Sequence, residues 1–146
     1  MMVITDPPRT VEPAALAGKA RDTLCLSWEE RRWTRKRVKT TGGREVALAL
    51  PTGSVLEPGA ILAVEERWYL VVEGRPEAVL AAFPSSHPEA LRIAFDVGNR
   101  HFSLGMEDGA LVVPDDPAMS QLLSRLGVRW ERREAVYSPL GGAGDD

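Results

Sequence analysis

Apolar and polar residues alternate along the first half of the chain in short stretches that turn residues separate. Glycine and proline mark these turns, for example at residues 41–43, 51–53 and 57–59. Short strands at near-regular spacing are typical of a small all-β domain of the sandwich or barrel kind. The expected strands are 23–28, 33–40, 44–50, 61–65 and 68–72, and residues 14–20 are compatible with one or two helical turns.

The second half changes to a helical period. Residues 85–89 have the composition of a helix start, a Ser or His cap followed by Pro88, and Gly98 is the expected end of this helix. A second helix is expected after a cap at Asp115 or Asp116 and ends at Gly127. The apolar positions at helical spacing are Ala90, Leu91, Ala94 and Phe95 in the first helix, and Met119, Leu122, Leu123 and Leu126 in the second.

The expected elements from Trp68 onward follow the order strand, helix, strand, strand, helix, strand. Residues 76–83 are compatible with a short helix that has proline at its first position. The later strands are expected at 101–106, 110–113 and 129–137, with a hairpin turn at 107–109. This order is the βαββαβ, or ferredoxin-like, arrangement. We therefore expect two domains, a β-rich one at 1–74 and an α+β one at 75–146 that ends in a short flexible tail.

The overall composition is that of a globular protein. Hydrophobic residues make up 44% and charged residues 27% of the 146 residues. The net charge of −3 disfavours a general nucleic-acid or anionic-membrane binder. No apolar run approaches the ~20 residues that cross a bilayer, and no basic start precedes an apolar segment. These features favour a cytoplasmic protein.

Residues that could hold a metal through nitrogen or sulfur are scarce. The chain has two histidines, His87 and His101, and one cysteine, Cys25. One cysteine excludes an intrachain disulfide and a zinc ribbon. The alternation around Cys25 predicts a packed thiol, and the place of His87 predicts a surface residue in a helix cap. A single imidazole supplies one ligand where zinc or nickel needs several, so His101 by itself is most simply an exposed loop residue.

The stretch Ala94–His101, which reads AFDVGNRH, resembles the metal-binding signature of the UreE family of urease accessory proteins, which are nickel metallochaperones. Other blocks resemble the same family in the same order. These blocks are residues 34–37, 41–46, 50–53, 56–59 and 116–127, so the similarity extends over roughly 23–140.

This resemblance implies a non-catalytic homodimer that forms through the C-terminal domain. His101 of each protomer would meet its copy at the two-fold axis, so that one residue per chain becomes a pair of ligands for Ni(II), with Gly98, Asn99 and Arg100 as the supporting motif. It also implies delivery of nickel to apo-urease, directly or through the accessory GTPase. Zn(II) or Cu(II) are expected to substitute in vitro. Because imidazole binds metal only when neutral, affinity should fall below about pH 6.5.

The sequence departs from the family pattern at positions where many members carry additional histidines. Asp96 occupies one such position, residues 114–117 another, and the chain ends in Gly-Asp-Asp without a histidine-rich tail. Asp115, Asp116, Asp145 and Asp146 are candidate oxygen ligands, although an aspartate at such a place is more often a helix cap or a solvated chain end. The expected site is therefore sparse and releases its metal readily.

The segment Arg31–Lys39 is strongly basic. In an extended strand, Arg35, Arg37 and Lys39 lie on one face, where they would suit an acidic protein partner. The alternative is a charged strand edge that discourages aggregation. RNA binding is disfavoured because no aromatic residues are interleaved with the basic ones.

Two other functions remain as alternatives. A small phosphohydrolase on the ferredoxin-like domain would use Arg100 to hold phosphate and Asn99 to orient water. A metal-independent adaptor would act through the basic strand alone, and His101 would then be incidental.

Overall fold

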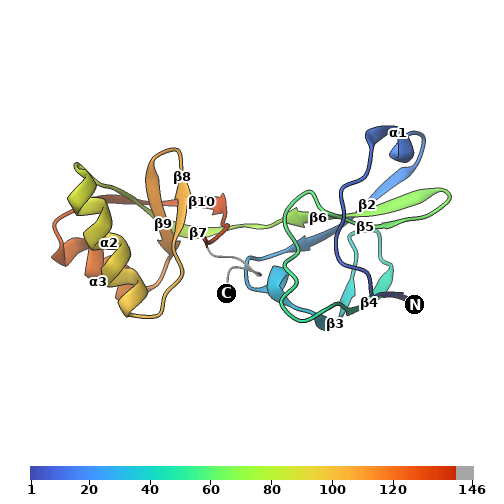
Figure 1. Ribbon diagram of the computed structural model, residues 1–146, viewed down its shortest axis with the longest axis horizontal. Helices are drawn as coiled ribbons and strands as arrows, with labels where there is room; N and C mark the ends of the chain where they lie inside the picture. The colour runs from blue at the N-terminus through green and yellow to red at the C-terminus, as the bar shows by residue number, and fades with distance from the viewer. Residues whose placement is uncertain (141–146) are drawn as a thin grey trace. The chain divides into compact units, whose positions relative to one another are not determined.

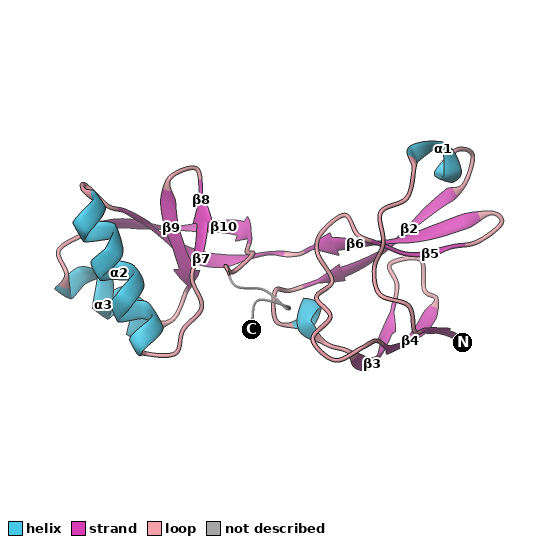
Figure 2. Cartoon of the chain, in the orientation of Figure 1, coloured by secondary structure: helices cyan, strands magenta, loops and turns pink. Residues whose placement is uncertain are grey.

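The computed structural model describes residues 1–140, which fall into two compact units, Met1–Arg75 and Pro76–Leu140 (Figure 1). Each unit has a hydrophobic core of its own. Strands predominate over helices (Figure 2), so the fold class is mixed and β-rich. Within residues 1–140, no helix is both long and apolar enough to span a membrane.

The N-terminal unit contains two three-stranded sheets, with strand orders β1-β4-β3 and β2-β6-β5. Their buried side chains, among them Leu24 and Leu70 from one sheet and Val46 and Leu48 from the other, belong to a single core. The elements of this unit are β1 (Met2–Ile4), α1 (Pro13–Leu16), β2 (Ala20–Leu26), the 3-10 helix η1 (Glu30–Arg32), β3 (Arg35–Lys39), β4 (Glu45–Ala49), β5 (Ile61–Val64) and β6 (Trp68–Gly74). The five strands expected here are present, each with ends within three residues of the expected ones.

A buried carboxylate joins β2 to the β3–β4 turn. The carboxylate of Asp22 accepts hydrogen bonds from Thr40 Oγ1 at 2.6 Å, Arg44 Nη1 at 2.8 Å and the backbone N–H of Gly42 at 2.8 Å. Burial would raise the pKa of Asp22, but these hydrogen bonds, with one from the N–H of Thr23, outweigh burial and lower it. The ionised carboxylate therefore stabilises this turn.

The C-terminal unit is a four-stranded antiparallel sheet of order β10-β7-β9-β8 with two helices on one face. The core side chains Leu80, Ala82, Leu111 and Val113 lie on that face of β7 and β9, and α2 and α3 lie side by side over them (Figure 1). The elements are β7 (Pro76–Phe83), α2 (His87–Asn99), β8 (Gly105–Glu107), β9 (Ala110–Pro114), α3 (Pro117–Arg125) and β10 (Arg129–Val136).

The structure corrects the expected helix at residues 76–83. This segment is β7, an inner strand that pairs with both β10 and β9. Its residues 79–82 are all buried, so the apolar residues form a continuous run without alternation, which periodicity alone does not distinguish from a helix. The expectation that the strand at Trp68 begins the βαββαβ order was therefore wrong as well. β6 pairs with β2 and β5 in the N-terminal unit, and the βαββαβ order begins at β7.

Two further expectations in the N-terminal unit fail. Cys25 is exposed, because its neighbours Leu24 and Leu26 occupy the inward positions of β2. No strand was expected before residue 23, but residues 2–4 form β1, which pairs in parallel with β4. Ile4 is buried in the core, so tertiary packing orders this short segment.

Candidate functional site

His101 lies immediately after the C-terminal end of α2. Ser86 begins the helix by accepting a hydrogen bond from the N–H of Glu89, and Arg100 is the residue at its C-terminal cap. Beyond Arg100, the N–H of His101 donates to the carbonyl of Gly98 at 2.9 Å, and the N–H of Phe102 donates to that of Val97 at 3.3 Å. These two bonds are the Schellman motif, which turns the chain sharply away from the helix.

The backbone of His101 is left-handed, with φ of 61°. Glycine usually occupies this position of the motif, because other L-residues pay roughly 1–2 kcal/mol for the left-handed conformation. His101 is also exposed at the surface of the unit. A strained residue that is neither buried nor needed for packing suggests a functional role for its side chain.

The local structure differs from the expected boundaries around His101. The helix continues past Gly98 to Asn99, and the following strand β8 begins at Gly105 instead of residue 101. The cause is the Schellman turn, which uses residues 100–102, followed by Phe102 and Leu104, which pack partly against the core.

The other residues of the motif are exposed, and one of them is tied to the helix. Arg100 Nη1 donates to the carbonyl of Asp96 at 3.2 Å, while Asn99 is exposed at the last turn. The Asp96 carboxylate pairs with Arg92 at 3.0 Å, an i, i+4 contact on the helix surface. Asp96 is therefore engaged within its own helix.

Two large apolar side chains of α2 are exposed. Phe95 is 68% exposed and Leu91 58% exposed, one turn apart on the helix. Both were expected on the buried face, but Ile93 and Val97 occupy it instead, each fully buried. The sequence carries the signal for this second face, since Ala90, Ile93, Ala94 and Val97 also follow the i, i+3, i+4, i+7 spacing. Because they lie one turn apart, these two side chains form a candidate interaction surface.

The aspartates considered as extra ligands have structural contacts. Asp116 caps α3 by accepting a hydrogen bond from the N–H of Ala118 at 2.8 Å, and Asp115 pairs with Arg132 at 3.3 Å. Asp145 and Asp146, with the expected tail, lie outside the described residues. Within residues 1–140, no group of three or more His, Cys, Asp or Glu residues is arranged to hold a metal ion.

The basic residues Arg35, Arg37 and Lys39 lie exposed on β3, at the edge of the sheet β1-β4-β3. Lys36 is on the opposite face, where its ammonium stacks over Trp33 at 4.8 Å from the ring centroid. Arg31 was placed in the same basic run, but it is buried in the N-terminal unit. The exposed basic residues of this run are therefore Arg32 on η1 and those of β3.

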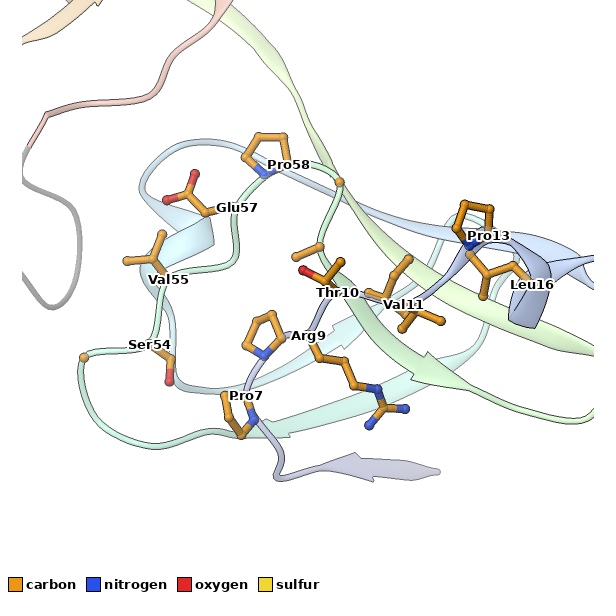
Figure 3. Close-up of a pocket in the computed structure, with 15 residues that line it drawn as sticks. Pro7, Arg9, Thr10, Val11, Pro13, Leu16, Ser54, Val55, Glu57 and Pro58 are labelled. Carbon is orange, nitrogen blue, oxygen red and sulfur yellow. The ribbon is translucent and has the colours of Figure 1, made fainter.

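A groove of about 800 Å³ in the N-terminal unit lies between the segment around Arg9 and the loop before β5, and is lined largely by prolines and aliphatic side chains (Figure 3). It contains none of the predicted site residues. His87, the other histidine, is the first residue of α2 and is exposed there, at the opposite end of the helix from His101.

Comparisons with known proteins agree over nearly the whole chain. Residues 5–73 match the N-terminal domain and residues 77–146 the C-terminal domain of the family described as UreE urease accessory protein. A Ralstonia nicotianae protein named Urease accessory protein UreE is 34% identical over 89% of this chain. Proteins of the same name from Burkholderia ambifaria and a Synechococcus species are 32% and 37% identical over 93% and 82% of the chain. The chain spans 62%, 67% and 81% of the lengths of these three relatives.

Proposed function

Because this chain belongs to the UreE family of urease accessory proteins, we propose that it binds Ni(II) and delivers the ion during assembly of the urease metallocentre. The observation that carries the proposal is His101, an exposed histidine held in a strained left-handed turn at the end of α2. The family's name does not favour a phosphohydrolase, and Arg100 uses its guanidinium to contact its own helix.

The metal site requires two copies of the chain. One imidazole supplies a single ligand, and a two-fold axis beside His101 would supply a second identical one. Imidazole suits Ni(II), and it also binds Zn(II) and Cu(II), which are expected to compete in vitro. Since Asp96, Asp115 and Asp116 have partners of their own, few protein ligands remain, which suits a carrier that must release its cargo.

The surface of α2 supports a dimer through the C-terminal unit. Phe95 and Leu91 are exposed apolar residues on the helix that ends at His101. Gly98, also on this helix, would have no atom of residues 1–140 within 4 Å of an added Cβ, so no contact in this part of the chain requires glycine there. A backbone that approaches closely from a second chain would explain both the glycine and the apolar residues.

The remaining assignments follow from this role. We infer that 1–74 is a two-sheet sandwich that binds protein partners through Arg35, Arg37 and Lys39, and that 75–146 is a ferredoxin-like domain for metal binding and dimerisation. The sheet order of β7 to β10 supports the second assignment. The partners would be apo-urease and the accessory GTPase in the cytoplasm, with no catalytic step by this chain.

Calorimetry with Ni(II) tests the metal site. Wild-type protein should bind about one ion per two chains. His101→Ala should abolish this binding, while His87→Ala should leave it unchanged, because His87 lies at the far end of the same helix. Equal binding by the His101→Ala variant would exclude the assignment of the site.

Light scattering after size exclusion tests the dimer. Phe95→Asp should convert the dimer to a monomer and remove nickel binding with it. Met106→Asp is the matched control, because Met106 is 61% exposed in the same unit but lies on strand β8. If Phe95→Asp stays dimeric, the interface lies elsewhere.

A further inference from the structure

On β3, the residues with exposed basic side chains are also those whose backbone groups point toward the unpaired edge of the sheet. β3 pairs with β4 through Arg35↔Ala49, Arg37↔Ala47 and Lys39↔Glu45 on one face. At the two ends of this ladder, the N–H of Leu50 donates to the carbonyl of Thr34, and the N–H of Thr40 donates to that of Arg44, both at 2.8 Å.

These two bonds show which residues of β3 direct their backbone groups toward β4. In an antiparallel pair, hydrogen-bonded positions alternate along the strand. Thr34 and Thr40 are bonded positions, so the even-numbered residues between them also face β4. The N–H and C=O groups of Arg35, Arg37 and Lys39 therefore point to the other edge, where no strand pairs with β3 among residues 1–140.

The same three residues lack ionic partners in the described part of the chain. No ion pair includes Arg35, Arg37 or Lys39, whereas Arg21, Arg44 and Arg75 elsewhere in this unit pair with carboxylates. The neighbours of Arg35 and Arg37 across the strand are alanines, which cannot neutralise or cover them. Lys39 lies opposite Glu45, with no ion pair between them. Unpaired backbone groups thus coincide on alternate residues of one edge with three cations that have no ion pair, and Arg35 and Arg37 have no carboxylate opposite them.

We propose that β3 binds an extended acidic segment of a partner protein by strand addition. The segment forms a new edge strand whose backbone pairs with Arg35, Arg37 and Lys39. Its acidic side chains, two residues apart, lie beside the three cations on the same face. This inference rests on the proposed role of these residues in partner binding, and it names the partner's chemistry and the mode of contact.

A short edge strand with lysine and arginine also discourages aggregation, and this function makes a different prediction. Protection against aggregation needs only the charges, so an acidic peptide would then bind through charge alone, without a required backbone register. Strand addition requires both the charges and alternate backbone amides of the peptide.

The test uses the full chain and the synthetic peptide acetyl-Glu-Val-Glu-Val-Glu-Val-Glu-amide, with binding followed by NMR shifts up to about 1 mM peptide. Arg35→Glu with Arg37→Glu should weaken binding roughly tenfold or more. Arg67→Glu, an exposed arginine in the β5–β6 turn, is the control and should have little effect. N-methylation of the alternate peptide amides that point toward β3 should abolish binding. Methylation of the other amides, which point away from β3, should not.

Each result has a definite consequence. No binding of the unmethylated peptide, equal binding by the reversed-charge variant, or equal effects of the two methylation sets would overturn strand addition. Nickel calorimetry on the Arg35→Glu, Arg37→Glu variant separates this proposal from the metal site, because binding at His101 should be unchanged. A loss of peptide binding with intact nickel binding supports the edge as a distinct docking surface.

Discussion

Replacement of His101 by glycine should remove nickel binding and at the same time make the C-terminal unit more stable. The left-handed backbone of His101 costs a non-glycine residue roughly 1–2 kcal/mol, while glycine adds about 0.5–1 kcal/mol of chain entropy to the unfolded state. The difference predicts a gain of about 0.5–1 kcal/mol for His101→Gly. For a unit of this size, that gain raises Tm by about 2–8 °C.

Scanning calorimetry in the presence of EDTA measures this effect, because bound metal would stabilise the wild type by mass action. His101→Ala is the matched variant. It also lacks the imidazole but keeps a Cβ at φ of 61°. Its free energy of unfolding should therefore be lower than that of the glycine variant by about 1 kcal/mol. A glycine variant no more stable than the alanine variant would refute the argument from strain. Nickel binding retained by both variants would refute the role of the imidazole.

Three other substitutions test the packing and the interface. Asp22→Ala should lower the free energy of unfolding of the N-terminal unit, measured by urea denaturation, by about 2–4 kcal/mol. Because the pKa of Asp22 is lowered in the folded state, the stabilisation is present at neutral pH and should fade as the pH drops below about 4, and the variant should lack this pH dependence. Burial raises the pKa of Tyr137 to about 12, although a hydrogen bond with Ser103 opposes this shift, so the folded state favours the neutral phenol. The stability of the C-terminal unit should therefore fall as the pH rises from about 10 to about 12, and Tyr137→Phe should remove this fall when urea denaturation is measured at each pH. Gly98→Ala should stabilise α2 by up to about 1 kcal/mol yet weaken the dimer, as measured by unfolding and by sedimentation.

Local sequence patterns predict much of the fold where one face of an element is buried. Strands β2 to β6 alternate or lie between clear turn residues, and α2 and α3 begin at caps that are among the candidates expected for them, Ser86 and Asp116. The pattern fails at β7 because an inner strand covered on both faces loses its alternation. It also fails at β1, which is ordered by its pairing with β4 and so depends on residues far along the chain.

The candidate site is predicted less completely than the fold. The sequence identifies His101 through a short motif, but its left-handed backbone depends on the two hydrogen bonds of the Schellman turn. The exposure of Phe95 could not be obtained from periodicity, because two sets of apolar residues in α2 are each compatible with a helical face and only packing selects one. The basic residues of β3 are visible in the sequence, whereas the direction of their backbone groups requires the register with β4.

Three residues near the end of α2 are each unfavourable for a chain on its own. Phe95 exposes most of its ring to water, Gly98 weakens the helix by about 1 kcal/mol relative to alanine, and His101 holds a strained backbone. Local rules favour a polar residue, alanine and glycine at these positions, and departures from such rules concentrate at functional sites. The proposed dimer would account for all three together, because a second copy of the chain would cover Phe95, approach Gly98 closely and place a second imidazole beside His101. The coincidence of these departures on one helix is a stronger argument for a shared metal site than the count of histidines in a single chain.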